Sequence, residues 1–152
     1  MFLHDRWDDY NFIYNLEATE ILTFMPNVKW TTFSEVNPER EYFAFANVGE
    51  RKSVWSYFSL IMGAQRVAKQ LEATKGAVGI TGRLGFLNKK LVVVGVFESE
   101  DALNEFAHSG QHANCMEKTK SMVKVMKCVK WSILGSNLPP TIEDAVSRAN
   151  AK

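Results

Sequence analysis

The chain of 152 residues is long enough for one domain with a hydrophobic core, and its 46% hydrophobic and 23% charged residues are typical of a globular protein. Its 18 basic and 17 acidic residues leave a formal net charge of +1, which argues against a nucleic-acid-binding protein. We expect no membrane-spanning helix, because no apolar run reaches about 18 residues, and no signal peptide, because the first ten residues are acidic. The two cysteines, Cys115 and Cys128, lack the spacing of a metal site, so we expect reduced thiols in a cytoplasmic protein.

Residues 1–38 are rich in aromatic side chains, and we expect them to form an N-terminal extension that packs on the main domain. Pro26 and Asn27 predict a turn in this extension, with a short strand or helix on each side. The sequence leaves open whether the extension covers the mouth of a pocket or adds to a subunit contact.

Residues 39–135 are predicted to form the main domain. The run LVVVGVF at residues 91–97 is apolar enough to be a strand that is buried on both faces. Ser99 is a predicted N-cap, and Ser109–Gly110 predicts a break in the helix that Ser99 begins. The expected elements are a strand at residues 41–48, a helix at 53–73, strands at 77–86 and 91–97, the interrupted helix, an edge strand at 123–134, and a short exposed helix, capped by Thr141, in a tail at 136–152.

The order strand, helix, strand, strand, helix, strand predicts an α+β protein with the ferredoxin-like split βαβ arrangement. In this arrangement two helices cover one face of a four-stranded antiparallel sheet. The other face of residues 91–97 must then be buried by something else. We expect a second copy of the chain to cover it, which would give a homodimeric α+β barrel.

The segment VVGVFESEDALNEFAHSGQH, residues 93–112, carries a resemblance to a known family. Its features are an aromatic residue that ends the strand (Phe97), a Glu-Ser pair, an acidic first helical turn, an Ala-Leu pair, a second aromatic residue (Phe106), and Ser109 at the helix break. The segment is similar to the third strand and second helix of the dimeric α+β barrel superfamily, in particular the antibiotic-biosynthesis monooxygenases and their haem-degrading relatives.

This resemblance implies a cofactor-independent monooxygenase that acts on an aromatic or polyketide-like small molecule. In such a scheme a phenolic or enolic substrate is deprotonated, and its anion reacts directly with O2, so no metal or flavin cofactor is expected. The haem-degrading branch has an Asn on the first strand and a Trp and a His on the second helix. Here those positions carry Asn47, Phe106 and Met116, which argues against haem degradation.

His112 is the leading candidate for a catalytic base, because the pKa of imidazole lies near neutrality. Arg83 is the only charged residue in its strand and would either anchor an anionic substrate or oxyanion or pair with an acidic residue across the dimer. Asn47 ends its strand and is the third catalytic candidate, although it also suits a turn. His108 lies four residues before His112, so both can share one helix face, but Cys115, three residues after His112, is the only candidate for a third ligand, and we expect no metal site.

Four residues are expected to bind the substrate: Trp55, Phe58, Phe106 and His108. We expect Trp55, Tyr57 and Phe58 to face the sheet from the first helix, where aromatic side chains often form core. Two other functions stay open on the same fold. One is a cyclase, isomerase or dehydratase, and the other is a non-catalytic protein that binds haem, through His112, or another small molecule.

Overall fold

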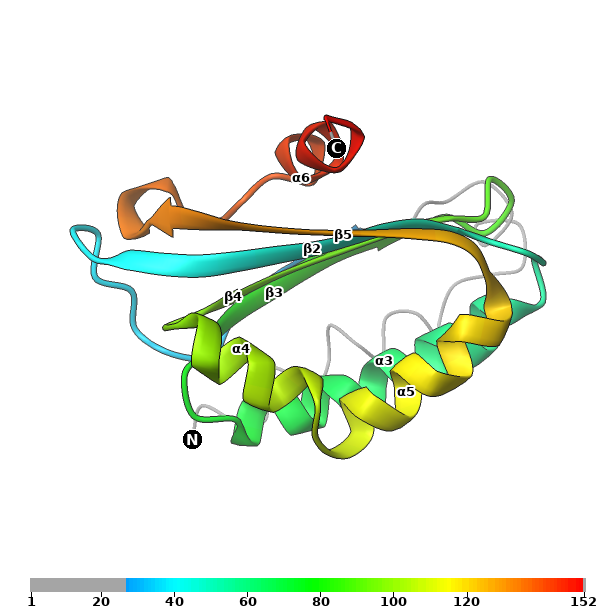
Figure 1. Cartoon of the computed structure of the whole chain (residues 1–152), viewed down its shortest axis with the longest axis horizontal. Helices are drawn as coiled ribbons and strands as arrows, with labels where there is room; N and C mark the ends of the chain where they lie inside the picture. The colour runs from blue at the N-terminus through cyan, green and yellow to red at the C-terminus, as the bar shows by residue number, and fades with distance from the viewer. Residues whose placement is uncertain (1–26, 152) are drawn as a thin grey trace.

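The structure, a computed structural model, describes residues 27–151, which form a five-stranded antiparallel sheet with helices on both faces. The helices at residues 56–73, 100–107 and 110–122 lie on one face, the inner face, and the helix at residues 142–150 lies on the opposite, outer face (Figure 1). The strand order is β1-β3-β4-β2-β5. The elements are β1 Asn27–Thr32, β2 Glu41–Arg51, α3 Ser56–Ala73, β3 Ala77–Leu84, β4 Lys90–Phe97, α4 Glu100–Ala107, α5 Gly110–Met122, β5 Val123–Leu134, the 3-10 turn η2 Gly135–Asn137 and α6 Ile142–Asn150.

The α+β class and the order of the six expected elements are confirmed, but the sheet has five strands instead of four. The additional strand, β1, pairs with β3 and comes from the part of the chain that we expected to be an extension. Its backbone supplies hydrogen-bonding partners to the free edge of β3. The predicted elements before Asn27 lie outside the described residues.

The interrupted helix forms as its sequence predicts. The Ser99 hydroxyl accepts a hydrogen bond from the backbone N–H of Ala102 at 3.1 Å, which caps α4. Two acidic residues, Glu100 and Asp101, lie in the first turn of α4, where the helix dipole favours negative charge. Gly110 has a φ of +56°, a conformation that glycine adopts at little cost, and this allows α5 to begin directly after α4.

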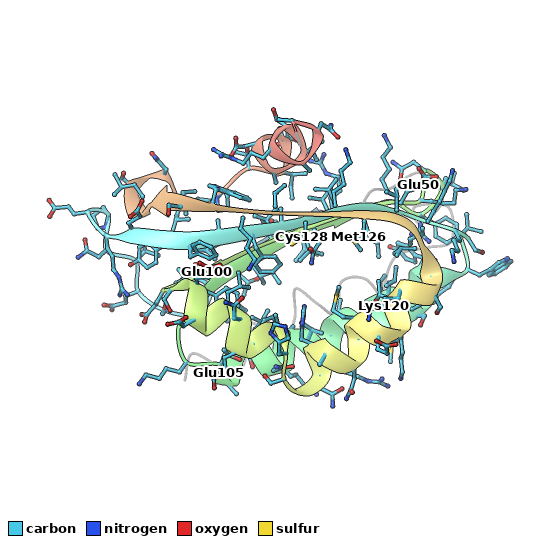
Figure 2. The ribbon with its side chains drawn as sticks, viewed as in Figure 1. Glu50, Glu100, Glu105, Lys120, Met126 and Cys128 are labelled. Carbon is cyan, nitrogen blue, oxygen red and sulfur yellow. The ribbon has the colours of Figure 1, made fainter. Side chains whose placement is uncertain are left out.

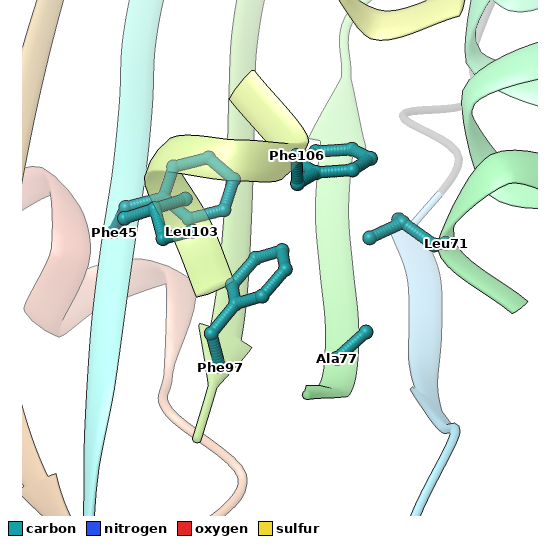
Figure 3. Close-up of a cluster of buried hydrophobic side chains, with 6 residues drawn as sticks. All are labelled: Phe45, Leu71, Ala77, Phe97, Leu103 and Phe106. Carbon is teal, nitrogen blue, oxygen red and sulfur yellow. The ribbon is translucent and has the colours of Figure 1, made fainter. Parts of the chain in front are cut away.

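The core on the inner face is a cluster of aromatic and aliphatic side chains (Figure 3). The Phe97 ring at the end of β4 lies 6.1 Å from the Phe45 ring and 5.4 Å from the Phe106 ring, measured between centroids. Val94 and Val96, which point to the outer face of the same strand, are fully buried. The prediction that residues 91–97 are covered on both faces is therefore confirmed.

The outer face is covered by the same chain and not, as we expected, by a second copy. Ala145 and Ala149 of α6 are fully buried and pack in a cluster with Val92, Val94 and Val129 of the sheet. These small side chains let the helix backbone approach the sheet closely. The prediction of an exposed terminal helix was therefore wrong, although Thr141 does cap α6 by accepting a hydrogen bond from a backbone N–H at 3.1 Å.

The rest of the outer face is covered by side chains from both ends of the described chain. Trp30 of β1, Val36 and Leu138 pack against a cluster that includes Val78 and Val96. Among residues 27–151, no helix combines the length and the apolar character that crossing a bilayer requires.

One end of the domain is held by a buried arginine at the last position of β2. The side chain of Arg51 has no exposed surface. Its Nη1 donates to the carbonyl oxygens of Ser53 and Val54 at 3.0 and 3.2 Å, and its Nη2 donates to those of Gly85 and Phe86. Arg51 therefore fastens the β2–α3 loop to the β3–β4 hairpin, and burial lowers the pKa of its guanidinium.

Candidate functional site

A cavity of about 210 Å³ lies between the inner face of the sheet and helices α3 and α5. Most of its lining is apolar, with a few polar side chains, as is common in small-molecule sites. The apolar part includes Phe45, Ile61, Ala68, Ile80, Leu91, Phe106, Met116 and Met126. The polar part includes Asn47, Gln65, His112, Cys115 and Thr119.

His112 lies in the first turn of α5 and borders this cavity. Its backbone N–H donates to Oε1 of Gln70 at 2.7 Å, which ties α5 to α3. Its ring lies 4.6 Å from the Phe106 ring, between centroids, and its Nδ1 lies 3.1 Å from the carbonyl oxygen of Ala107. A carbonyl only accepts, so Nδ1 carries the proton in the neutral ring, and Nε2 is left with a lone pair.

The pKa of His112 is lowered by burial, because the cavity environment disfavours the imidazolium. The hydrogen bond to Ala107 opposes this effect, and the neighbouring His108 adds to it. At neutral pH the ring is therefore uncharged, which is the state that a proton-accepting base requires.

Asn47 reaches the cavity from β2, where it lies opposite Val93 of β4 and Cys128 of β5. Since side chains alternate along a strand, Asn47 shares the inner face with Phe45. Within residues 27–151 its side-chain amide makes no hydrogen bond, so it is available to a ligand. Figure 2 shows Met126 and Cys128 on the same helix-facing side of β5.

Two further polar residues of the cavity, Cys115 and Thr119, were not predicted. They follow His112 by three and seven residues, so the helical period places all three on one face of α5. The Cys115 sulfur lies 3.9 Å from the Thr119 hydroxyl. A side chain at Gly63 of α3 would come within 2.8 Å of that sulfur, which shows how closely the two helices approach. The spacing from His112 was the signal in the sequence that would have found them.

Arg83 also borders the cavity, but its guanidinium is engaged on the outer face. Its Nη2 lies 3.2 Å from Oε1 of Glu143 on α6. The sequence left open a pair between Arg83 and an acidic residue across the dimer; the structure shows an acidic partner in the same chain. The structure brings together His112, Asn47 and Phe106, and it directs the charged group of Arg83 elsewhere.

The remaining predicted binding residues do not line this cavity. Trp55 and Phe58, which we expected to face the sheet, are 77% and 51% exposed, whereas Tyr57 between them is buried. The expectation was wrong because the buried face of α3 is centred on Tyr57 and Ile61, and Phe58 lies 100° further around the helix. His108 is exposed, and its Nδ1 lies 2.7 Å from the carbonyl oxygen of Asn104.

By sequence, no family model and no curated protein matches the chain. By structure, it is similar to a candidate monooxygenase from Fusobacterium nucleatum, with 9% identity and a TM-score of 0.59 over 72% of this chain and 50% of that one. It is similar to a candidate antibiotic-biosynthesis monooxygenase from Nitrosomonas europaea, with 6% identity and a TM-score of 0.53 over 59% of this chain and 95% of that one. It is also similar to SnoaB, a cofactor-independent oxygenase from Streptomyces nogalater, with 15% identity and a TM-score of 0.52 over 66% of this chain and 99% of that one.

The chain thus spans half the length of the Fusobacterium protein and nearly the full length of the other two. At these identities the similarity concerns the fold, since one fold hosts many chemistries. The resemblance that residues 93–112 predicted is confirmed at this level, and the chain has the α+β fold of antibiotic-biosynthesis-monooxygenase-like proteins.

Proposed function

We propose that the protein is a cofactor-independent monooxygenase that oxidises an aromatic or polyketide-like small molecule in its inner cavity. The observation that carries this proposal is the state of His112. Its imidazole is neutral, its Nδ1 is engaged by Ala107, and its remaining nitrogen belongs to a ring that borders an apolar cavity. Such a nitrogen suits the removal of a proton from a phenol or an enol.

The reaction then needs only the substrate and O2. His112 Nε2 accepts the hydroxyl proton, and the substrate anion supplies the electrons that reduce O2 to a carbon-bound peroxide. Loss of water from that peroxide converts a ring CH2 or CH group into a carbonyl, so one oxygen atom enters the product and the other leaves as water. The side-chain N–H of Asn47, which also lines the cavity, donates to the developing oxyanion.

The lining of the cavity indicates the class of substrate. Aromatic and aliphatic side chains dominate it, and the nearest guanidinium, that of Arg83, is paired with Glu143. A neutral, planar molecule with one ionisable hydroxyl fits this lining better than a carboxylate or a phosphate, because a buried unpaired anion is costly.

Oxygen uptake with a panel of quinols and anthrones, without added cofactor, tests this proposal. Replacing His112→Gln removes the base, and we expect kcat to fall by about 100-fold or more. The matched control is His108→Gln, an exposed histidine one turn earlier, which should change kcat less than twofold. Equal losses in both variants, or no oxygen uptake with any member of the panel, would contradict the proposal.

Two other functions would also use His112, and each differs from the oxygenase in a measurable way. A cyclase, isomerase or dehydratase would also need the His112 base but would form product without oxygen. A haem-binding protein would use His112 Nε2 as a metal ligand, for which the Nδ1 hydrogen bond to Ala107 is a common supporting contact. A Soret band after addition of haem, lost in His112→Gln, would favour that reading.

The sequence also predicts a homodimer in a cytoplasmic biosynthetic pathway, and these three statements remain predictions. Cys115 and Cys128 form no disulfide with each other. With α6 on the outer face, a dimer would have to use another surface or displace this helix. Sedimentation equilibrium at micromolar concentration would measure the mass directly.

A further inference from the structure

Several large apolar side chains are exposed together at one end of the domain. Trp55, Phe58 and Met62 of the α3 region are 77%, 51% and 46% exposed, and Leu87 in the β3–β4 hairpin is 59% exposed. The Phe58 ring lies 6.2 Å from the Phe86 ring, between centroids, so the helix and the hairpin contribute to one surface. We call these four exposed residues the aromatic patch. Exposed apolar groups in such a cluster usually mark an interaction surface.

Several basic residues lie close to the aromatic patch along the chain. Lys52 precedes Trp55 in the β2–α3 loop, Lys89 and Lys90 follow Leu87 in the hairpin, and Arg66 lies one turn after Met62; Lys52, Lys90 and Arg66 are exposed. A partner that covers this surface would therefore combine aromatic or aliphatic groups with negative charge.

Residues 1–26 of the same chain have this composition. They hold five of the 17 acidic residues and one of the 18 basic residues, a net charge of −4, so the rest of the chain carries +5. Aromatic side chains occur throughout the same segment, at Phe2, Trp7, Tyr10, Phe12, Tyr14 and Phe24. The chain is thus divided into two parts of opposite charge.

β1 begins at the end of the sheet that carries the β3–β4 hairpin. β1 runs antiparallel to β3, with Asn27 opposite Arg83 and Val28 opposite Gly82. Asn27, the first described residue, therefore lies at the end of the sheet where β3 passes into the β3–β4 hairpin, which carries Leu87. An extended chain advances about 3.3 Å per residue, so 26 residues can span up to roughly 85 Å.

We propose that residues 1–26 dock on the aromatic patch of their own chain. Their aromatic side chains bury Trp55, Phe58 and Leu87, and their carboxylates face the lysines near the patch. The segment then lies beside the cavity, because Val28, two residues after its end, belongs to the cavity lining. This proposal concerns how the chain covers itself and does not depend on the chemistry proposed for His112.

Hydrogen–deuterium exchange of the full chain, read by mass spectrometry, tests the docking. We expect amides of residues 1–26 to exchange at least tenfold more slowly in the wild type than in Phe58→Asp or Leu87→Asp. The control is Leu134→Asp, a substitution of an exposed apolar residue at the C-terminal end of β5, which should leave that protection unchanged. Unchanged exchange of β4 amides in each variant shows that the domain is folded. Wild-type exchange of residues 1–26 at unstructured rates would overturn the proposal.

Reversing the charges on both sides of the proposed contact gives an independent test. Asp8→Lys with Asp9→Lys should reduce the protection of residues 1–26, and adding Lys89→Glu with Lys90→Glu should restore it. Two other occupants of the patch predict different results. If Phe58→Asp halves the sedimenting mass without changing exchange in residues 1–26, the occupant is a second copy. If vesicles of phosphatidylserine and phosphatidylcholine bind the wild type and not Phe58→Asp, it is an anionic membrane. Either result would overturn intramolecular docking.

Discussion

The side-chain amide of Gln70 bridges the break between α4 and α5, because its Oε1 accepts from the backbone N–H of His112 at 2.7 Å. Its Nε2 donates to the carbonyl oxygen of Ser109 at 3.0 Å, on the other side of the break. A side chain at Gly110 would come within 3.1 Å of this amide, so α3 and the break are in close contact. One residue of α3 thus sets the position of the helix that carries the proposed base.

We predict that Gln70→Ala lowers the free energy of unfolding by about 1–2 kcal/mol, because two hydrogen bonds across the break are lost. Urea unfolding at pH 7 measures this change. The matched control is Arg66→Ala, an exposed substitution one turn earlier on α3, which should cost less than about 0.5 kcal/mol. Equal stabilities of the two variants would show that the Gln70 contacts contribute nothing.

The free energy of unfolding should decrease as the pH is lowered, and His112 is one cause of this decrease. Its pKa in the folded chain is below the ordinary value of about 6.5, whereas the unfolded chain keeps that value. Between the two pKa values the unfolded chain binds more protons than the folded chain, so the free energy of unfolding rises with pH across this window. This contribution of His112 is lost as the pH falls below about 6.5. The slope of this component cannot exceed about 1.4 kcal/mol per pH unit.

Urea unfolding between pH 5 and 7.5 checks this dependence. We expect His112→Gln to lose this component of the slope and His108→Gln to retain most of it, because burial is the main cause of the lowered pKa of His112 and the neighbouring His108 is a smaller one. An NMR titration of the two imidazoles in the wild type would assign the effect directly. A slope that disappears in His108→Gln instead would contradict the prediction.

The substitution Arg51→Met should destabilise the protein by more than about 3 kcal/mol, since it removes hydrogen-bond donors from carbonyl oxygens at a buried site. The carbonyl groups of Gly85 and Phe86 lose the donor that Arg51 provides, whereas those of Ser53 and Val54 keep a second donor each. The control is Arg40→Ala, which removes an exposed ion pair to Glu98 with an N–O distance of 3.5 Å. We expect that change to cost less than about 1 kcal/mol by urea unfolding.

The packing of α6 on the sheet can be tested with a charge on either side of the helix. Ala145→Asp places a carboxylate in a fully buried position and should cost several kcal/mol, of about the size found for unpaired buried charges. Ser147→Asp on the exposed side should change stability by less than about 0.5 kcal/mol. Binding of a hydrophobic dye to Ala145→Asp, and not to Ser147→Asp, would report exposure of the outer face.

Local sequence patterns were sufficient for most elements of the fold. The β-branched run at residues 91–97, the Ser99 cap and the glycine at position 110 each specify their conformation through neighbouring residues. β1 was harder to predict, because its six residues, NVKWTT, show little alternation of polar and apolar side chains. They form a strand through their pairing with β3. The docking of α6 depends on a tertiary contact that its nine residues do not reveal.

The kinds of residue in the candidate site could be predicted from the sequence, but which of them border the cavity could not. Two histidines four residues apart share the helical region, and only packing shows that His112 borders the cavity while His108 is exposed. The aromatic residues of α3 were predictable as a group, but a single step along the helix separates the buried Tyr57 from the exposed Phe58. Arg83 could not be placed without knowing that α6 carries Glu143 to the same face.

The position of α6 has a consequence for how the protein responds to dilution. A sheet whose second face is covered by a neighbouring molecule loses that cover when the molecules dissociate, so its melting temperature depends on concentration. Here Ala145 and Ala149 belong to the same polypeptide as the valines that they bury. We therefore expect the cover that α6 gives to this face, and the protection of its β4 amides from hydrogen exchange, to be the same at nanomolar and at micromolar protein.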